Sequence, residues 1–254
     1  MNNSIEKKSN TPILIIGAVL LLAVLGGWWL FSSSKPSPNS NTAKTNTANT
    51  VKTTGIPANA PQGANPPNQS GSPTALVTLE EFADFQCPQC AAKDPVMKEI
   101  KAAYGSRIHF IFRNFPLSIP AHDKSYDAAV AAQAAAMQGK FWDMQNILFT
   151  NQKAWTADPN FRQIWKDYAQ KIGLDVPKWE NEMAGIATKN MVNEDMKRGK
   201  TIGINSTPSL YINGVEVQFE QMSLEGLRQL IDAELQKATP QNPTASTAPA
   251  NSNK

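Results

Sequence analysis

Two cysteines could carry out redox chemistry in this chain, and they are the only ones among its 254 residues. Cys87 and Cys90 lie three residues apart in the segment FQCPQC, residues 85–90. A thiolate one helical turn from a second thiol can attack a disulfide, form a mixed disulfide and be released by its neighbour. The spacing therefore predicts thiol–disulfide exchange.

The residues around the pair indicate how the first thiol becomes reactive. An apolar, strand-like run ends at Phe85, and Pro88 suits the first position of a helix, where its missing N–H is not needed. Cys90 then lies one turn inside the helix, on the same face as Cys87. Because unpaired N–H groups and the positive end of the helix dipole would point at the Cys87 sulfur, we expect this thiol to ionise readily.

The apolar pattern predicts one folded domain over residues 76–238, in the order β-α-β, helices, β-β-α. Strands are expected at residues 76–82 and 107–113. Between them, a helix should run from Pro88 to about Tyr104, with a kink at Pro95. Its expected apolar face consists of Ala92, Val96, Ile100 and Ala103. Strand, helix and strand at this spacing predict a right-handed crossover and a parallel pair.

A helical insert is expected at about residues 121–199, and a hairpin and a closing helix should follow it. Asn213 and Gly214 separate strand-like runs at residues 207–212 and 215–219, which is a strong two-residue hairpin signal. Ser223 can cap the last helix. The tryptophans of the insert are interpreted as packing residues; these are Trp142, Trp155, Trp165 and Trp179.

The N-terminal flank predicts a membrane anchor. Residues 13–31, ILIIGAVLLLAVLGGWWLF, carry no charge and would span about 28 Å as a helix, close to the hydrocarbon thickness of a bilayer. Lys7 and Lys8 precede this stretch, so residues 1–12 should be cytoplasmic and the remainder should lie outside the cell membrane. A cleaved signal peptide with small residues at 32–34 is the alternative. Either way, the domain would be exported into a cell envelope.

Residues 32–75 and 239–254 are rich in small and polar residues, so we expect a disordered linker and a disordered tail. The 44-residue linker would tether the domain to its anchor. Residues 76–238 hold 18 Lys and Arg against 20 Asp and Glu. The overall charge of +3 therefore comes from the flanks, and it does not indicate nucleic-acid binding.

Together these features resemble the DsbA-like branch of the thioredoxin superfamily. The resemblance covers roughly residues 74–238. It rests on EFADFQCPQC (81–90), RNFPL (113–117), an insert starting near His122, and STPSLYING (206–214). It implies an α/β thioredoxin-like core interrupted by a helical domain, acting on the thiols and disulfides of exported proteins. No cofactor and no metal are implied.

The resemblance assigns roles within the cysteine motif. Cys87 matches the attacking cysteine and Cys90 the resolving one, and Pro88 matches the proline between them. Gln89 stands where the most oxidising members carry histidine, and a neutral amide stabilises a thiolate less than an imidazolium does. We expect Pro88 and Gln89 to contact the substrate.

Two further positions match the family away from the cysteines. Pro208, preceded by Thr207, resembles the cis-proline beside the active site. It would offer backbone groups to an extended substrate strand and keep metal off the thiols.

Glu81 matches the buried acid beneath the disulfide, where it would take the proton of Cys90 during resolution. That role needs a carboxyl group with a raised pKa. The alternative is a solvated or salt-bridged strand residue. Asp84 lies close by in sequence, and Arg113 or Lys101 could pair with either acid.

The leading hypothesis is a membrane-tethered oxidase that introduces disulfides into exported proteins and is re-oxidised by a quinone-linked membrane partner. A reductase or isomerase served by an electron donor is the alternative in the same class, because direction follows redox potential and partner. Two other classes remain open. A metal-binding module lacks support because His109 and His122 do not show zinc-ligand spacing. We interpret His109 as structural, whereas His122 could pack, cap a helix or serve the site. A chaperone-like binding module would not need the cysteines.

Overall fold

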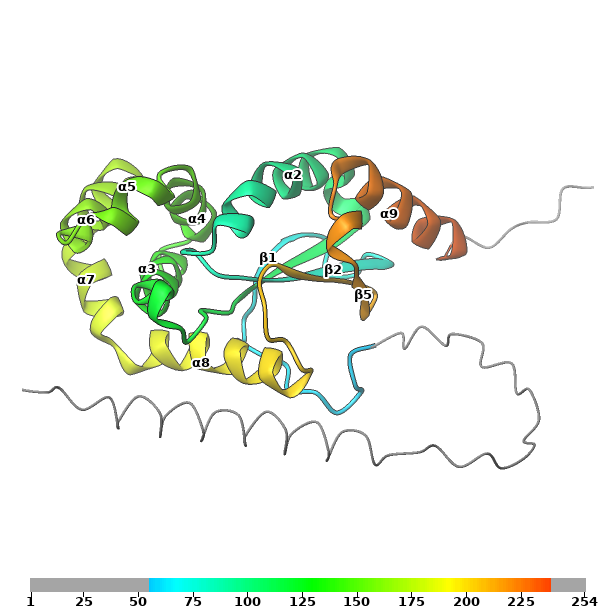
Figure 1. Cartoon of the computed structure of the whole chain (residues 1–254), viewed down its shortest axis with the longest axis horizontal. Helices are drawn as coiled ribbons and strands as arrows, with labels where there is room; N and C mark the ends of the chain where they lie inside the picture. Colours follow the sequence, from blue (N-terminus) through cyan, green and yellow to red (C-terminus); the bar gives the residue numbers. More distant parts are fainter. Residues whose placement is uncertain (1–54, 239–254) are drawn as a thin grey trace, which may run out of the picture. The chain divides into compact units, whose positions relative to one another are not determined.

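The computed structural model describes residues 55–238 (Figure 1). The predicted anchor at residues 13–31, the cytoplasmic N-terminus, most of the linker and the tail at residues 239–254 lie outside the described residues. Within residues 55–238, no helix is both long enough and apolar enough to span a bilayer.

A five-stranded sheet in the order β1-β3-β2-β4-β5 forms the centre of the fold. The strands are β1 (Asn68–Gly71), β2 (Val77–Ala83), β3 (Ile108–Asn114), β4 (Ser209–Ile212) and β5 (Val215–Val217). The pair β2–β3 is parallel, as the sequence predicts, and the other neighbours are antiparallel. β2 lies between β3 and β4 and is buried on both faces, so that even its two glutamates, Glu80 and Glu81, are buried.

Helices cover both faces of the sheet. α2 (Pro88–Tyr104) and α9 (Leu224–Ala238) contact each other and lie on one face, and α8 (Ile186–Thr201) contacts β3 from the other (Figure 1). The insert also contains α3 (Ser125–Ala136), α4 (Phe141–Thr150), α5 (Gln152–Ala157), α6 (Phe161–Lys171) and α7 (Val176–Ala184). Short 3₁₀ turns lie at Gly105–Arg107, Pro120–His122 and Phe219–Gln221. The predicted thioredoxin-like core with a helical insert is confirmed. Trp155, Trp165 and Trp179 are buried in its core.

The buried face of α2 differs from the predicted one. Its buried residues are Cys90, Asp94, Met97, Ile100 and Tyr104, whereas Ala92 and Ala103 are exposed. Asp94 can be buried because Gln145 Nε2 donates to its carboxylate at 2.6 Å and Lys98 pairs with it at 2.5 Å. A pattern of apolar residues cannot detect a buried acid whose partner lies on another helix. The helix runs through Pro95 without interruption.

The hairpin between β4 and β5 follows the sequence signal. Asn213 and Gly214 have φ angles of 48° and 80°, the left-handed conformations that a tight two-residue turn requires. β5 ends at Val217, two residues earlier than expected, because a 3₁₀ turn begins at Phe219. Ser223 Oγ accepts a hydrogen bond from the Gly226 N–H at 3.1 Å, so this residue caps α9 as predicted.

Residues 55–71, here called the strap, correct the prediction of a disordered linker that extends to residue 75. The strap contains β1, which pairs antiparallel with β3 from Asn68 to Gly71. At its other end, the Ile56 N–H donates to the Gly214 carbonyl at 2.8 Å. A polar, proline-rich segment has little apolar surface to bury, but the strap is held through backbone hydrogen bonds instead, which composition does not reveal.

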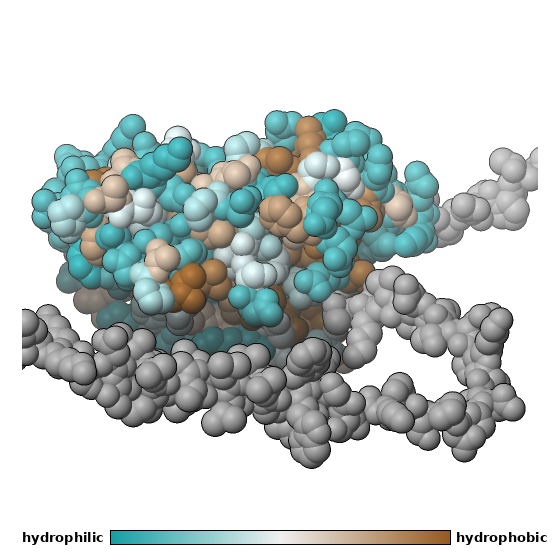
Figure 2. All heavy atoms as spheres, in the orientation of Figure 1, coloured by the Kyte–Doolittle hydropathy of each residue, from teal (hydrophilic) through white to brown (hydrophobic). Residues whose placement is uncertain are grey.

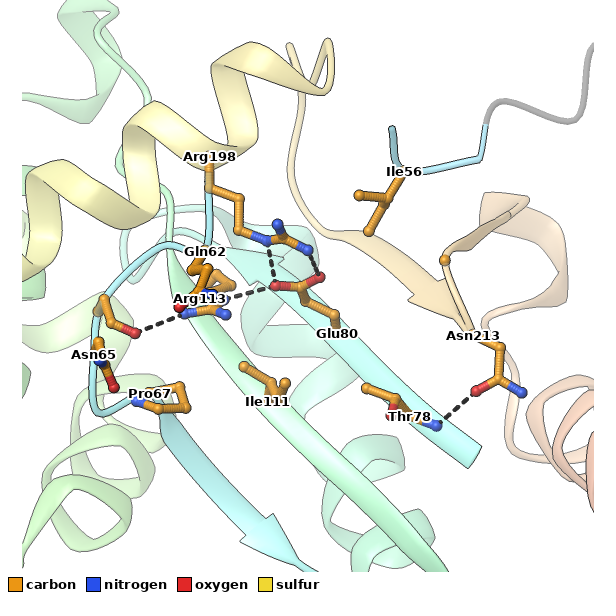
Figure 3. A pocket seen from close by; sticks show the side chains of 12 residues that line it. Ile56, Gln62, Asn65, Pro67, Thr78, Glu80, Ile111, Arg113, Arg198 and Asn213 are labelled. Carbon is orange, nitrogen blue, oxygen red and sulfur yellow. Dashed lines mark hydrogen bonds and ion pairs between the residues drawn. The ribbon is translucent and has the colours of Figure 1, made fainter. Parts of the chain in front are cut away.

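Four charged side chains lie between the strap and the sheet. Figure 3 shows Glu80, Arg113 and Arg198, and the fourth is Asp195. Glu80 accepts from Arg113 Nε at 2.7 Å and from Arg198 Nε and Nη2 at 2.7 and 2.6 Å. Asp195 accepts from Arg113 Nη1 at 3.0 Å. Burial alone would raise the pKa of Glu80, but the two guanidinium groups outweigh burial and hold that pKa below its ordinary value.

The same ionic groups bind the backbone of the strap. Arg198 Nη1 donates to the Pro61 carbonyl at 2.6 Å, and Asp195 Oδ1 accepts from the Ala64 N–H at 2.8 Å. Arg113 Nη1 also reaches the Ala64 carbonyl at 3.2 Å. The strap is therefore part of the folded domain.

The face of the domain in Figure 2 is mainly hydrophilic, and its hydrophobic residues form separate spots. The large apolar side chains that are most exposed lie in different parts of the chain: Leu76, Ile119, Met137, Ile186, Val215 and Phe219. Scattered exposure of this kind is ordinary for a protein surface.

The register of the strap predicts a clear difference between two glycine substitutions. Gly71 and Gly173 both have left-handed φ angles, 79° and 78°. A β-carbon on Gly71 would lie 2.1 Å from the Ile108 carbonyl oxygen, whereas one on Gly173 would meet open space. Gly173→Ala should cost about 1–2 kcal/mol for the left-handed backbone. Gly71→Ala should cost about 1–3 kcal/mol more, because β1 must move away from β3. Urea unfolding measures both, and equal losses would show that β1 does not pair with β3 in solution.

Candidate active site

The two cysteines lie at the junction of the central strand and helix α2. β2 ends at Ala83, and α2 begins at Pro88 with Cys87 as its N-cap residue. Cys87 has φ −71° and ψ 120°, so its backbone is still extended. Both cysteines are free thiols, and both are buried. The structure therefore places the pair where the sequence predicts it.

Cys87 is the acidic thiol of the pair. Its pKa is lowered to about 5, chiefly by hydrogen bonding with the Cys90 thiol, and further by Thr207 and the N–H groups of Cys90 and Gln89. Burial acts in the opposite direction and is outweighed. The Cys87 Sγ also lies 3.3 Å from the Thr207 carbonyl oxygen, to which the protonated thiol donates. A thiol with this pKa is a thiolate at neutral pH.

Cys90 behaves in the opposite way. Its pKa is raised well above the ordinary value, first by burial and then by its interactions with Cys87. Its Sγ accepts a weak hydrogen bond from the Asp84 N–H at 3.5 Å. One exchangeable thiolate next to one protonated thiol is the arrangement that attack and resolution require.

Glu81 is buried on the α2 side of β2, with 3% of its surface exposed. Burial raises the pKa of this carboxyl group to about 7, an effect that Lys101 opposes and Asp94 supports. The negative charge of ionised Glu81 in turn raises the pKa of Cys90. The carboxyl group thus lies close enough to influence Cys90 and has a pKa suited to proton transfer at neutral pH.

Of the two bases expected to pair with Glu81 or Asp84, only Lys101 lies near Glu81. Lys101 is half-buried, its Nζ lies 3.9 Å from the centroid of the Trp142 ring, and burial lowers its pKa. Arg113, the other candidate, pairs with neither acid, because its guanidinium pairs with Glu80 and Asp195 instead. Adjacent residues of a strand point to opposite faces, so Glu80 and Glu81 have different partners.

The remaining predicted site residues surround Cys87. The peptide bond between Thr207 and Pro208 is cis. Pro208 is buried and Thr207 is half-buried, whereas Pro88 and Gln89 are exposed.

Asp84 and His122 form a contact that ties the junction to the insert. The Asp84 carboxylate accepts from the Gln86 N–H at 2.7 Å and the Leu117 N–H at 2.9 Å, and His122 Nδ1 lies 2.6 Å from it. His109 lies apart from this contact, on the sheet, where its Nε2 is 2.7 Å from Gln69 Oε1. Within residues 55–238, no three His, Cys, Asp or Glu side chains are arranged to hold a metal ion.

Two glutamines at the site were not predicted. Gln86 Oε1 accepts from the Lys124 N–H at 2.8 Å, and Gln152 Nε2 donates to the carbonyl oxygens of Phe85 and Cys87, both at 2.8 Å. Gln152 lies 65 residues from Cys87 in sequence. Nothing in its local sequence distinguishes it from other polar residues at helix starts, so only the tertiary structure reveals it.

Solved structures share this fold. A thioredoxin-like oxidoreductase from Silicibacter pomeroyi is 22% identical with a TM-score of 0.55, and the match covers 68% of this chain and 94% of that one. The thiol-disulfide exchange protein alpha-DsbA2 of Wolbachia pipientis is also 22% identical, with a TM-score of 0.55 and coverage of 66% and 87%. Oxidised BdbD of Bacillus subtilis is 20% identical, with a TM-score of 0.60 and coverage of 70% and 98%. At these identities the likeness concerns the fold.

Curated relatives match part of the chain. The Na(+)/H(+) antiporter NhaA 1 of Mycolicibacterium gilvum is 34% identical over 146 residues, which is 57% of this chain and 23% of the antiporter. NhaA 3 of Salinispora tropica is 31% identical over 144 residues, 57% of this chain and 21% of that protein. The chain therefore spans less than a quarter of these relatives, whose names describe the whole antiporters.

A protein family described as thioredoxin matches residues 65–233. The matched segment begins in the strap and ends in α9, and it includes the cysteine pair, the insert and the cis-proline. It covers most of the chain. The protein therefore belongs to the thioredoxin family.

Proposed function

We propose that the protein is a thiol–disulfide oxidoreductase that acts on exported proteins, and that it works as an oxidase. The observation that carries the proposal is the asymmetry of the two thiols. The pKa of Cys87 is lowered to about 5, whereas that of Cys90 is raised well above its ordinary value. Packing alone does not require such a difference, but exchange through one thiolate does.

The reaction starts with a disulfide between Cys87 and Cys90. A substrate thiolate attacks Cys87 Sγ, the bond between the two cysteines breaks, and Cys90 leaves as a thiolate that takes up a proton. A second substrate thiolate then attacks the substrate sulfur of the mixed disulfide and releases Cys87 as a stable thiolate. Two electrons pass from substrate to protein, and the substrate gains one disulfide.

The acidity of Cys87 supports the oxidising direction. Stabilising this thiolate favours the reduced protein, and a favoured reduced form makes the disulfide a stronger oxidant. The neutral Gln89 side chain contributes less to this effect than a positively charged residue would.

Glu81 is proposed to exchange a proton with Cys90. A carboxyl group with a pKa of about 7 can accept the Cys90 proton when this thiol attacks, and can return it when the thiolate leaves. Thr207 and cis-Pro208 are proposed to bind the substrate as an extended strand, and Pro88 and Gln89 to contact it at the exposed start of α2.

The proposed location is the cell envelope. Residues 13–31 would anchor the chain once in the membrane, with residues 1–12 in the cytoplasm and the folded domain outside. The partners would be exported proteins with thiols or disulfides and a membrane redox partner, either a quinone-linked re-oxidase or an electron donor. A reductase or isomerase remains the alternative of the same fold.

The reduction potential of the pair tests the direction. Equilibration of the protein with glutathione buffers should give a value above about −200 mV, towards the oxidising end near −120 mV. Gln89→His should raise the potential further, because an imidazolium stabilises the Cys87 thiolate. A value near about −270 mV would indicate a reductase. If no reversible two-electron couple appeared, a binding module or a metal site would replace the oxidoreductase, and replacing both cysteines with serine should then leave binding intact.

The role of Glu81 predicts a pH profile. In wild type, resolution of a mixed disulfide by Cys90 should accelerate as pH rises through about 7, where the carboxyl group ionises. Glu81→Gln should abolish this acceleration with pH and slow resolution by about 10²-fold. The control is Glu80→Gln, which removes the neighbouring carboxylate on the other face of β2. This variant should keep the acceleration with pH. Identical pH profiles for wild type and Glu81→Gln would contradict the role.

The same substitution has an effect on stability with a definite sign. The folded pKa of Glu81 lies above its unfolded value of 4.5, so the group destabilises the fold increasingly as pH rises from about 4.5 through 7. Glu81→Gln should therefore raise the free energy of unfolding at pH 8 by about 3 kcal/mol, and by much less at pH 4.

The anchor is testable in a bacterial host. The full chain should sediment with membranes, and protease added to spheroplasts should degrade the domain. A chain lacking residues 1–31 should be soluble and remain inside the cell. Protection of the full-length domain from added protease would place it in the cytoplasm and contradict the proposal.

A further inference from the structure

Gln152 connects the helical insert to the backbone on either side of Gln86. Its Nε2 group has two N–H bonds, and it donates to the carbonyl oxygens of Phe85 and Cys87, both at 2.8 Å. The side chain is buried, with 8% of the residue exposed. Both hydrogen bonds are buried, so each is more costly to lose than a bond at the surface.

The position of the second carbonyl is what matters for the chemistry. Cys87 is the N-cap of α2, and its carbonyl is also the first acceptor of the helix, receiving the Ala91 N–H at 3.2 Å. The orientation of this peptide group sets where the following N–H groups point. Those of Gln89 and Cys90 stabilise the Cys87 sulfur.

We propose that Gln152 is a positioning residue for the attacking cysteine: its amide fixes the peptide groups of Phe85 and Cys87, and so aims the N–H groups of the first turn of α2 at the Cys87 sulfur. The inference rests on the proposed function, since it concerns the thiolate of that reaction. In this proposal, a residue of the insert helps to keep the pKa of the Cys87 thiol low.

A second glutamine offers a matched control. Gln145 also belongs to the insert, is also buried, and also donates through Nε2 to α2, but its acceptor is the Asp94 carboxylate in the second turn. Both glutamines therefore link the insert to the same helix. Only Gln152 holds the backbone at the cysteine.

The test is a titration of the Cys87 thiolate by its ultraviolet absorbance in the reduced full chain. Gln152→Met keeps the volume of the side chain and removes both N–H donors. The midpoint should rise from about 5 by roughly half a unit or more. Gln145→Met should leave the midpoint unchanged, although this variant, like Gln152→Met, should be less stable because it loses a buried hydrogen bond. The titratable groups of the site are present in every variant: Cys90 beside Cys87, and Glu81, whose charge acts on Cys90.

Equal midpoints for wild type and Gln152→Met, or equal shifts for the two methionine variants, would overturn the inference. If Gln152→Met does not fold, Gln152→Leu also removes both N–H donors and keeps a side chain of similar size without adding a charge. Its midpoint should also rise, and an unchanged midpoint would overturn the inference. The titration needs no turnover, so it is independent of the glutathione equilibrium that tests the oxidoreductase itself.

Discussion

The placement of two adjacent glutamates on the central strand constrains the rest of the structure. β2 is buried on both faces, and alternation along the strand sends Glu80 and Glu81 to opposite sides. Burying a carboxylate is costly unless it is paired or protonated. The protein uses a different solution on each side. Two arginines keep Glu80 ionised beneath the strap, whereas the pKa of Glu81 rises to about 7 beneath the cysteines. On the Glu80 face, the ion pairs hold the strap to the sheet. On the Glu81 face, the carboxyl group can exchange a proton.

The helical insert does more than cover the core, because it holds the short junction between β2 and α2 at several points. His122 contacts Asp84, and the backbone of Lys124 contacts Gln86. The Leu117 N–H, which lies between β3 and the insert, also contacts Asp84. These contacts come from residues that follow β3, so the junction depends on residues that come later in the sequence. The thiols therefore lie where the core and the insert meet, and neither part defines their surroundings alone.

The sequence predicted those features whose causes are local. The cysteine spacing, Pro88 and the apolar run of β2 predicted the strand–helix junction, and Asn213 with Gly214 predicted the hairpin. The strap, the acid buried on α2 and the partners of Arg113 were missed or assigned wrongly. Each of these depends on a partner far away in the chain, such as Asp195 for the strap or Gln145 for Asp94. Polarity and spacing carry no information about such partners.

The route by which the chain enters the domain has a consequence for how the thiols are presented. Ile56 binds the hairpin at Gly214, and the hairpin binds Thr78 near the start of β2, where the Thr78 N–H donates to Asn213 Oδ1 at 2.8 Å. Cys87 follows the opposite end of that strand. The point at which the chain enters the domain and the Cys87 sulfur therefore lie at opposite ends of β2. In the proposed reaction, a polypeptide at the Cys87 sulfur would therefore lie away from the point at which the chain enters the domain.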